Sequence, residues 1–335
     1  MSNSKQLDPG MHSALCFFLT LLFILLANLL PGIGAVVMLF WALPVGVCVA
    51  RDGIINGIAV GILAGACSFF FMDVSAVLPA LTLCIAVGIL SGICFRLKVP
   101  PVNLLLLVVL AGGILLPVAV LTDNYINGIS WGTFIEDFRG EILASLAIYE
   151  EAGFDEVIAS SGMTFAEFQA KMVSYMTKVL PSVFVIIGMG CAYCNFLFIQ
   201  WRLKKTCLDK KFNFLPRFRE ISLPWWSLWL LVAALAAFIA GNFLDQPLYK
   251  TVALNIIICS APVFFVGGIG FFLWFLDFLH AGKGVKIAAL IACLIFTSFS
   301  IVFFPMMGVF DAAVDYRSKM IKRRKELEKD KDNRS

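Results

Sequence analysis

The feature that most constrains this chain is a series of long stretches that contain no Asp, Glu, Lys or Arg. A helix that crosses a bilayer needs about 20 predominantly apolar residues. Nine uncharged stretches reach about that length, at 13–30, 31–50, 53–72, 74–95, 99–122, 179–201, 221–244, 251–276 and 287–310. A soluble protein can bury one such segment, but not nine. The sequence therefore predicts an all-α, polytopic transmembrane helix bundle with about nine membrane segments.

The first two stretches are contiguous, and we expect a hairpin where Pro31 and Gly32 interrupt them. Lys5 precedes the first stretch as it would in a signal peptide, but the apolar run exceeds the roughly 7–15 residues of a signal core. We therefore expect a retained first helix. Charged residues make up 14% of the chain, against about 25% in an average soluble domain, which agrees with a membrane protein.

Charges in the loops predict an orientation, because cytoplasmic loops carry an excess of Lys and Arg. Segment 202–220 holds seven bases and two acids, whereas segment 123–178 holds nine acids and three bases. We expect the N-terminus, Arg51, Arg96 and the 202–220 loop in the cytoplasm of a bacterial plasma membrane. The predicted regions are a five-span N-terminal membrane region (1–122), an acidic extracytoplasmic helical segment (123–178), a C-terminal membrane region (179–310) and a basic cytoplasmic tail (311–335).

The tail conflicts with a simple count of crossings. From Arg317 onward it carries nine bases and four acids, which favours the cytoplasm, yet three crossings after the 202–220 loop would leave it outside. One solution is that stretch 251–276 is broken at Gly267, Gly268 and Gly270 into two half-helices that enter and leave on one side. An incorrect boundary elsewhere is the alternative.

The acidic segment contains its own helix signals. Thr164 and Glu167 form a capping-box pattern, and Phe165, Phe168, Met172 and Met176 then follow at helical spacing. We expect an amphipathic helix that lies on the membrane surface or on the bundle and runs to Pro181. A second helix is expected over 134–149. Loops of this length are usually functional or disordered.

Glycines and amides supply the candidate binding residues. Small residues at every fourth position allow helices to approach closely, either within the chain or against a separate subunit. Amides inside spans form interhelical hydrogen bonds or contact a ligand. The candidate helix-docking face is Gly53, Gly57, Gly61 and Gly65, and the candidate ligand-binding amides are Asn56, Asn103, Asn195 and Asn255.

Ionisable residues and catalytic motifs are sparse. Asp277 and His280 lie three residues apart at the end of a span and form a candidate polar pair or an interfacial ion pair. No metalloprotease or P-loop motif occurs, and we expect neither an enzyme nor an ATPase. Cys191 and Cys194 have no second cysteine pair or nearby His to complete a metal site. We predict no cofactor, metal or specific nucleic-acid partner. Anionic lipid is a candidate partner of the tail.

Several short motifs resemble the YybS-like family of bacterial predicted membrane proteins, a domain of unknown function. They cover most of the chain and are Leu43-Pro44, Arg51-Asp52-Gly53, Leu180-Pro181, Asn195, Trp201-Arg202-Leu203-Lys204-Lys205, Leu223-Pro224-Trp225-Trp226, Asn255, Gly308-Val309-Phe310-Asp311 and Tyr316-Arg317.

That family is grouped at fold level with the S components of energy-coupling factor vitamin transporters. The resemblance implies a small-molecule-binding or transport-associated subunit that docks on a transmembrane coupling subunit or ATPase. Extra C-terminal spans and the long outer segment depart from ordinary S components, and fold analogy does not establish function. The alternative is a membrane scaffold or assembly protein that acts through its outer helices and basic tail.

Overall fold

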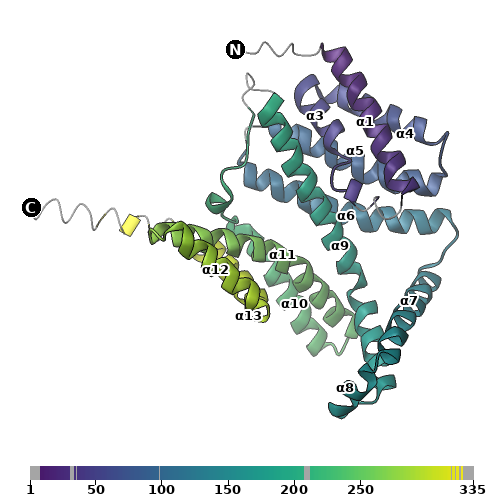
Figure 1. Ribbon diagram of the computed structural model, residues 1–335, viewed down its shortest axis with the longest axis vertical. Helices are drawn as coiled ribbons and strands as arrows, with labels where there is room; N and C mark the ends of the chain where they lie inside the picture. The colour runs from purple at the N-terminus through teal and green to yellow at the C-terminus, as the bar shows by residue number, and fades with distance from the viewer. Residues whose placement is uncertain are drawn as a thin grey trace, which may run out of the picture. The chain divides into compact units, whose positions relative to one another are not determined.

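The computed structural model describes residues 8–30, 34, 36–97, 99–206, 212–317, 319, 320, 322, 323 and 326, and every regular element within them is a helix (Figure 1). The all-α prediction is confirmed. The chain divides into two compact units, Met1–Phe214 and Leu215–Ser335, each described by itself below. The hairpin predicted at Pro31 and Gly32 lies outside the described residues.

Unit 1 begins with a bundle of helices that pack through small residues. Its members are α1 (Pro9–Leu29), α3 (Leu43–Asp52), α4 (Ile54–Ser68), α5 (Val74–Arg96) and α6 (Pro101–Ile126). A side chain added at Gly92 of α5 would come within 2.7 Å of the Gly46 carbonyl oxygen of α3, and one at Gly112 of α6 would come within 2.8 Å of the Gly188 carbonyl oxygen. Glycine at these positions therefore allows backbone contact between helices.

A break separates α3 from α4. Gly53 adopts φ +118°, a conformation that L side chains rarely adopt, and the two helices on either side hold 10 and 15 residues. At 1.5 Å per residue they extend only about 15 and 23 Å, short of a hydrocarbon core of about 30 Å. The predicted spans 31–50 and 53–72 are therefore not two full-length helices.

The rest of unit 1 contains α7 (Trp131–Glu151), α8 (Phe154–Ser160) and α9 (Phe165–Thr206). The helix predicted over 134–149 is confirmed by α7. The amphipathic helix predicted to stop near Pro181 instead continues through it as the 42-residue α9. Pro181 is tolerated within the helix, as prolines often are in membrane helices. The predicted region boundary at 178/179 falls inside α9.

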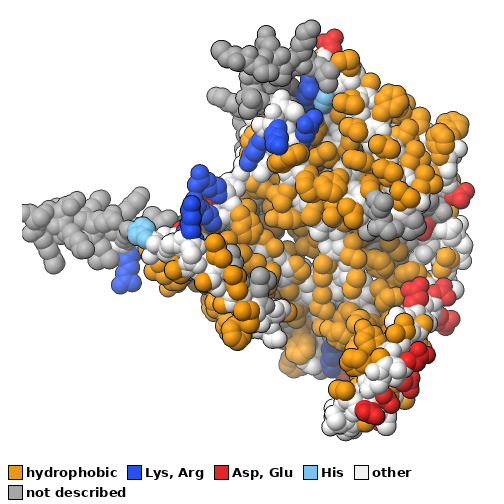
Figure 2. All heavy atoms as spheres, viewed as in Figure 1, with side chains coloured by type: hydrophobic (Ala, Val, Ile, Leu, Met, Phe, Trp, Pro, Cys, Tyr) orange, Lys and Arg blue, Asp and Glu red, His pale blue; other side chains and the backbone are white. Residues whose placement is uncertain are grey.

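Basic residues gather at one end of unit 1. Arg96 Nη1 donates to the Val49 carbonyl (3.2 Å), Asn213 Nδ2 donates to the Leu97 carbonyl (3.2 Å), and Lys204 Nζ lies 5.2 Å from the centre of the Phe214 ring. Figure 2 shows acidic side chains on α7 and α8 and an apolar surface over much of the visible face. The charge separation predicted from the loops is thus present within this unit.

Unit 2 contains η1 (Phe218–Glu220), η2 (Trp225–Leu228), α10 (Trp229–Phe243), α11 (Pro247–Phe278), α12 (Lys283–Ile295) and α13 (Thr297–Val314). The re-entrant break predicted at Gly267, Gly268 and Gly270 is wrong, because α11 runs through all three. Their role is packing: a side chain at Gly268 would collide with the Phe304 carbonyl oxygen. The interruption lies instead at Phe296, between α12 and α13.

Helices α11 and α13 run parallel. Phe265 contacts Phe304 (ring centres 5.5 Å apart), and further along both helices Phe271 contacts Tyr316 (6.2 Å). The 13-residue α12 makes the return between them and extends about 20 Å. The end of α13 therefore lies at the same end of unit 2 as the end of α11.

Six helices among the described residues are long and apolar enough to cross a bilayer, and the predicted total of about nine is not confirmed. They are α1, α6, α9, Trp225–Phe243, α11 and α13. Helices α3, α4 and α12 are too short. The break at Gly53 directly follows the charged residues Arg51 and Asp52, whereas the break at Phe296 divides an apolar run that contains no charge to mark it.

Candidate functional site

The acidic segment folds into three helices whose starts are encoded locally. The Ser130 hydroxyl accepts a hydrogen bond from the Thr133 backbone N–H (3.1 Å) and caps α7. Gly153, in the left-handed region at φ +81°, separates α7 from α8. The predicted capping box is present: Thr164 N–H donates to Glu167 Oε2 (3.0 Å), and Glu167 N–H donates to Thr164 Oγ1 (3.3 Å).

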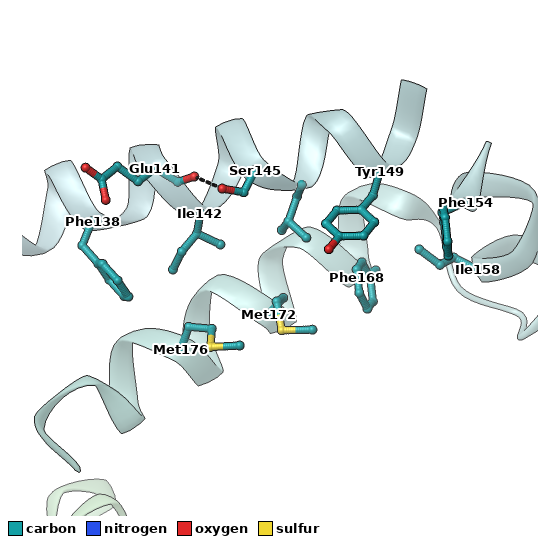
Figure 3. A pocket seen from close by; sticks show the side chains of 11 residues that line it. Phe138, Glu141, Ile142, Ser145, Tyr149, Phe154, Ile158, Phe168, Met172 and Met176 are labelled. Carbon is teal, nitrogen blue, oxygen red and sulfur yellow. Dashed lines mark hydrogen bonds between the residues drawn. The ribbon is translucent and has the colours of Figure 1, made fainter. Parts of the chain in front are cut away.

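Helices α7, α8 and α9 enclose an apolar groove of about 580 Å³ (Figure 3). Side chains of α7 point toward those of α9, and α8 closes one end of the groove. Tyr149 of α7 meets Phe154 of α8 edge to face, with ring centres 5.6 Å apart. The lining residues are Phe138, Glu141, Ile142, Ser145, Leu146, Tyr149, Phe154, Ile158, Phe168, Met172 and Met176.

The chemistry of the groove is that of a binding site for an apolar body. Ligand pockets are commonly 300–1,000 Å³ in volume, mostly apolar, and carry a few polar groups that fix orientation. Polar groups here come from Glu141, Ser145 and Tyr149. The Ser145 hydroxyl donates to the Glu141 backbone carbonyl (2.9 Å), while the Glu141 carboxylate points away from α9. Met172 and Met176 are flexible side chains that adapt to different ligand shapes.

The sequence identified only part of this groove. Phe165, Phe168, Met172 and Met176 were expected on one helical face, and all of them except Phe165 line the groove. The contribution of α7 and α8 was not predicted, although the apolar residues Phe138, Ile142 and Leu146 of α7 repeat at intervals of four.

The four amides proposed as ligand-binding residues lie on different helices. Asn195 is buried and ties α9 to the turn before α3: its Oδ1 accepts from Ala42 N–H (3.0 Å) and its Nδ2 donates to the Met38 carbonyl (3.0 Å). Asn56 donates to the backbone carbonyl one turn back, as Asn255 does in unit 2. Asn103 is half-buried near the start of α6. Asn195 therefore forms hydrogen bonds between segments of the bundle, which was the second of the two roles considered for these amides, beside contact with a ligand.

The glycine face of α4 is covered within unit 1. Added side chains would meet Val49 at Gly57, Ile85 at Gly61 and Leu81 at Gly65, and Gly53 forms the break before α4. These contacts are those of internal helix packing. A docking surface for a separate subunit on these four glycines would require α3 and α5 to move.

The carboxylate of Asp277 is held by two cations. Arg219 Nη1 lies 2.5 Å from its Oδ2, and Lys286 Nζ binds its Oδ1. His280 contacts Asp277 through the backbone, where its N–H donates to the Asp277 carbonyl (3.0 Å). Arg219 comes from η1 and Lys286 from α12, so the sequence spacing of Asp277 and His280 did not reveal these partners.

A second ion pair anchors the end of α13. Arg317 Nε donates to Asp311 Oδ2 (2.9 Å), and Arg317 Nη1 donates to the Arg219 carbonyl (2.7 Å). The guanidinium lies 5.6 Å from the centre of the Phe271 ring. Burial lowers the pKa of Arg317, while the charge of Asp311 acts in the opposite direction. Arg317 therefore joins η1, α11 and α13.

Sequence reasoning also missed a buried polar cluster in unit 1. His12 Nδ1 lies 2.5 Å from Asp52 Oδ2, and the Asp52 side chain is only 2% exposed. The Ser13 hydroxyl donates to the same oxygen (3.5 Å), and Arg51 Nε lies 3.5 Å from Oδ1. A signal was available, because His12 and Asp52 flank uncharged stretches whose ends were predicted on the same side. The cluster fixes the start of α1 to the end of α3.

These helices define an integral membrane protein built from several apolar spans. The chain matches the family described as Predicted membrane protein (DUF2232) over residues 18–312 and belongs to it. The YybS-like resemblance is thereby confirmed. No curated protein and no solved structure matches the chain.

Proposed function

We propose that this protein is a membrane-embedded binding subunit that holds a small apolar or amphipathic molecule in the groove between α7, α8 and α9. The groove itself carries the proposal, because its volume of about 580 Å³ and its apolar lining suit such a ligand. The sequence also suggested a binding subunit, but it pointed to amides in the membrane spans, whereas this proposal places the binding site between the acidic helices.

Charge around the groove narrows the ligand class. Glu141 lines the groove, and the acids of the neighbouring turns of α7 and α8 far outnumber the bases. Such a field attracts cations and repels anions. The favoured ligand therefore has an apolar body and a neutral or cationic head, rather than a carboxylate or phosphate.

The transport-associated part of the proposal rests on the S-component resemblance. The chain has no P-loop motif, so an energised step would need a separate ATPase or transmembrane coupling subunit in a bacterial plasma membrane. The basic tail would lie on anionic lipid. Copurification in mild detergent tests this part: recovery of the chain without any ATPase or transmembrane partner would count against it and leave ligand binding to be judged separately.

Ligand binding is tested with photoactivatable alkyl probes on the full chain in nanodiscs. An alkylamine is expected to crosslink to α7 and α9 more strongly than an alkyl carboxylate of equal length. Ile142→Trp fills the groove and should lower crosslinking roughly tenfold, which corresponds to about 1.4 kcal/mol. Ile148→Trp is the matched control, because Ile148 also lies on α7 but is 67% exposed and outside the groove. Equal crosslinking in both variants would contradict the proposal.

The alternative function, a membrane scaffold, is favoured by the apolar surface outside the groove. Ile148 of α7 and Val157 of α8 are 67% and 64% exposed. Exposed apolar patches on a non-membrane element are typical of interaction surfaces. The same two variants separate the functions: a scaffold would lose its copurifying partner with Ile148→Trp, whereas a ligand-binding subunit would lose its probe with Ile142→Trp.

A further inference from the structure

The end of unit 2 holds a second, chemically different hollow. It has a volume of about 270 Å³ and lies where η1, the last turns of α11 and the first turn of α12 meet. Three of its side chains are cations and one is an acid. The lining residues are Arg217, Phe218, Arg219, Leu273, Asp277 and Lys286.

Its charges are only partly neutralised. One carboxylate, Asp277, serves both Arg219 and Lys286, and among the described residues no side-chain partner is present for Arg217. The three cations and one acid leave a net charge of about +2. An arginine offers five N–H donors and a lysine three, so Arg219 and Lys286 each retain donors beyond those that Asp277 accepts. The neighbouring Glu220 does not line the hollow.

The wall of the hollow is held in place from outside it. The Arg219 backbone carbonyl accepts from Arg317, whose side chain is 8% exposed and paired with Asp311. The backbone that carries Arg219 is thereby fixed rather than part of a free loop. A site with positioned donors binds an anion better than a set of scattered surface lysines does.

The surroundings favour a lipid over a soluble anion. Phe218 and Leu273 line the hollow beside the cations. Helix α12 leads away from it with an exposed apolar surface, on which Ile287 and Ile291 are 59% and 50% exposed. An acyl chain can lie along this surface while the head group remains among the cations. Basic pockets between membrane helices are a recognised form of head-group site.

We propose that this hollow binds the phosphate head group of an anionic membrane phospholipid, with its acyl chains along α12. The site is distinct from the groove of unit 1 in location and in preferred charge. It also differs from general attraction of the tail to a membrane, because it assigns the head group to Arg217, Arg219 and Lys286.

Native mass spectrometry of the full chain, delipidated in detergent and titrated with phosphatidylglycerol or phosphatidylcholine, tests the site. Phosphatidylglycerol should bind more tightly in the first binding step. Lys286→Gln and Arg217→Gln should each weaken it about fivefold, because a cation beside an anionic head group contributes about that factor. Lys286→Arg should preserve binding. Lys283→Gln is the matched control, since Lys283 lies on the same helix outside the hollow.

Three results would overturn the proposal. One is equal affinity for the two lipids. Another is an equal loss from Lys283→Gln and Lys286→Gln, which would indicate general surface attraction. The third is complete displacement of phosphatidylglycerol by excess inorganic phosphate, which would identify a soluble anion as the occupant. Arg217→Gln keeps the test valid if Lys286→Gln fails to fold, because Arg217 is not part of the Asp277 ion pairs.

Discussion

Two glycine-containing segments of this protein have opposite structures. In unit 1 a single glycine, Gly53, ends one helix and begins another, whereas in unit 2 the cluster at Gly267, Gly268 and Gly270 leaves α11 unbroken. Gly53 has φ +118°, but the α11 glycines are helical and lie against other backbone or side chains. Glycine is thus required in one place for its dihedral angles and in the other for its lack of a side chain.

The largest expected effect concerns the side of the membrane reached after α11. If α11 crosses unbroken, Gly282→Cys and Asp245→Cys, made in a cysteine-free background, should be labelled from opposite sides by an impermeant maleimide. A side chain added at Gly282 would meet no other atom within 4 Å, so a cysteine fits there. Labelling of both positions from the same side would restore the re-entrant arrangement that the sequence suggested.

Substitution at the α11–α13 crossing should cause the largest loss of stability. The side chain of Gly268→Val must displace the backbone of α13 at Phe304, and we expect a loss of about 3 kcal/mol. Unfolding by sodium dodecyl sulfate in mixed micelles, followed by circular dichroism, measures it. Gly190→Val is the control, because Gly190 lies in α9 with open space around it, and should change stability by less than about 0.5 kcal/mol. Similar losses in both variants would show that α11 and α13 are not in backbone contact.

The contrast also shows how far the sequence predicts the fold. Charge-free stretches bounded by polar residues located α1, α5 and α6 to within a few residues. They could not show the break at Phe296, because apolar residues continue on both sides of it. The glycine cluster of α11 was misread for a related reason: spacing alone does not distinguish a glycine that turns the chain from one that admits a neighbouring helix.

The candidate sites were less predictable than the helices. The α9 face of the groove follows from periodicity within one helix, but the opposing faces of α7 and α8 depend on tertiary packing. Asp277 was identified as a polar residue at a span end, whereas its partners Arg219 and Lys286 come from 58 residues before it and 9 residues after it. Contacts between separate elements have no signature in the spacing of a single sequence.

A smaller effect is expected at the break itself. Gly53→Ala must hold a side chain at φ +118°, which costs about 2 kcal/mol of stability. The same detergent titration measures the loss. Gly190→Ala, in the helical interior of α9, should instead gain roughly 0.5–1 kcal/mol through its better helix propensity. If Gly53→Ala were neutral, the positive φ at Gly53 would not be required, and α3 and α4 would form one continuous helix in place of the second and third predicted spans.

The smallest effect in this series tests a second interruption in unit 1, the turn at residues 38–42 before α3. This turn contains no described glycine and is held instead by Asn195, whose side chain bonds the Ala42 N–H and the Met38 carbonyl. Asn195→Ala leaves a buried N–H without its acceptor, so we expect a loss of about 1.5 kcal/mol in the same titration. Asn56→Ala is the control, because Asn56 is exposed and its side chain donates to the Asp52 carbonyl four residues earlier. This substitution should change stability by less than about 0.5 kcal/mol. Equal losses would mean that Asn195 does not fix the turn. A larger loss from Asn195→Ala together with unchanged probe crosslinking at the α7–α9 groove would separate the structural amide from the ligand site.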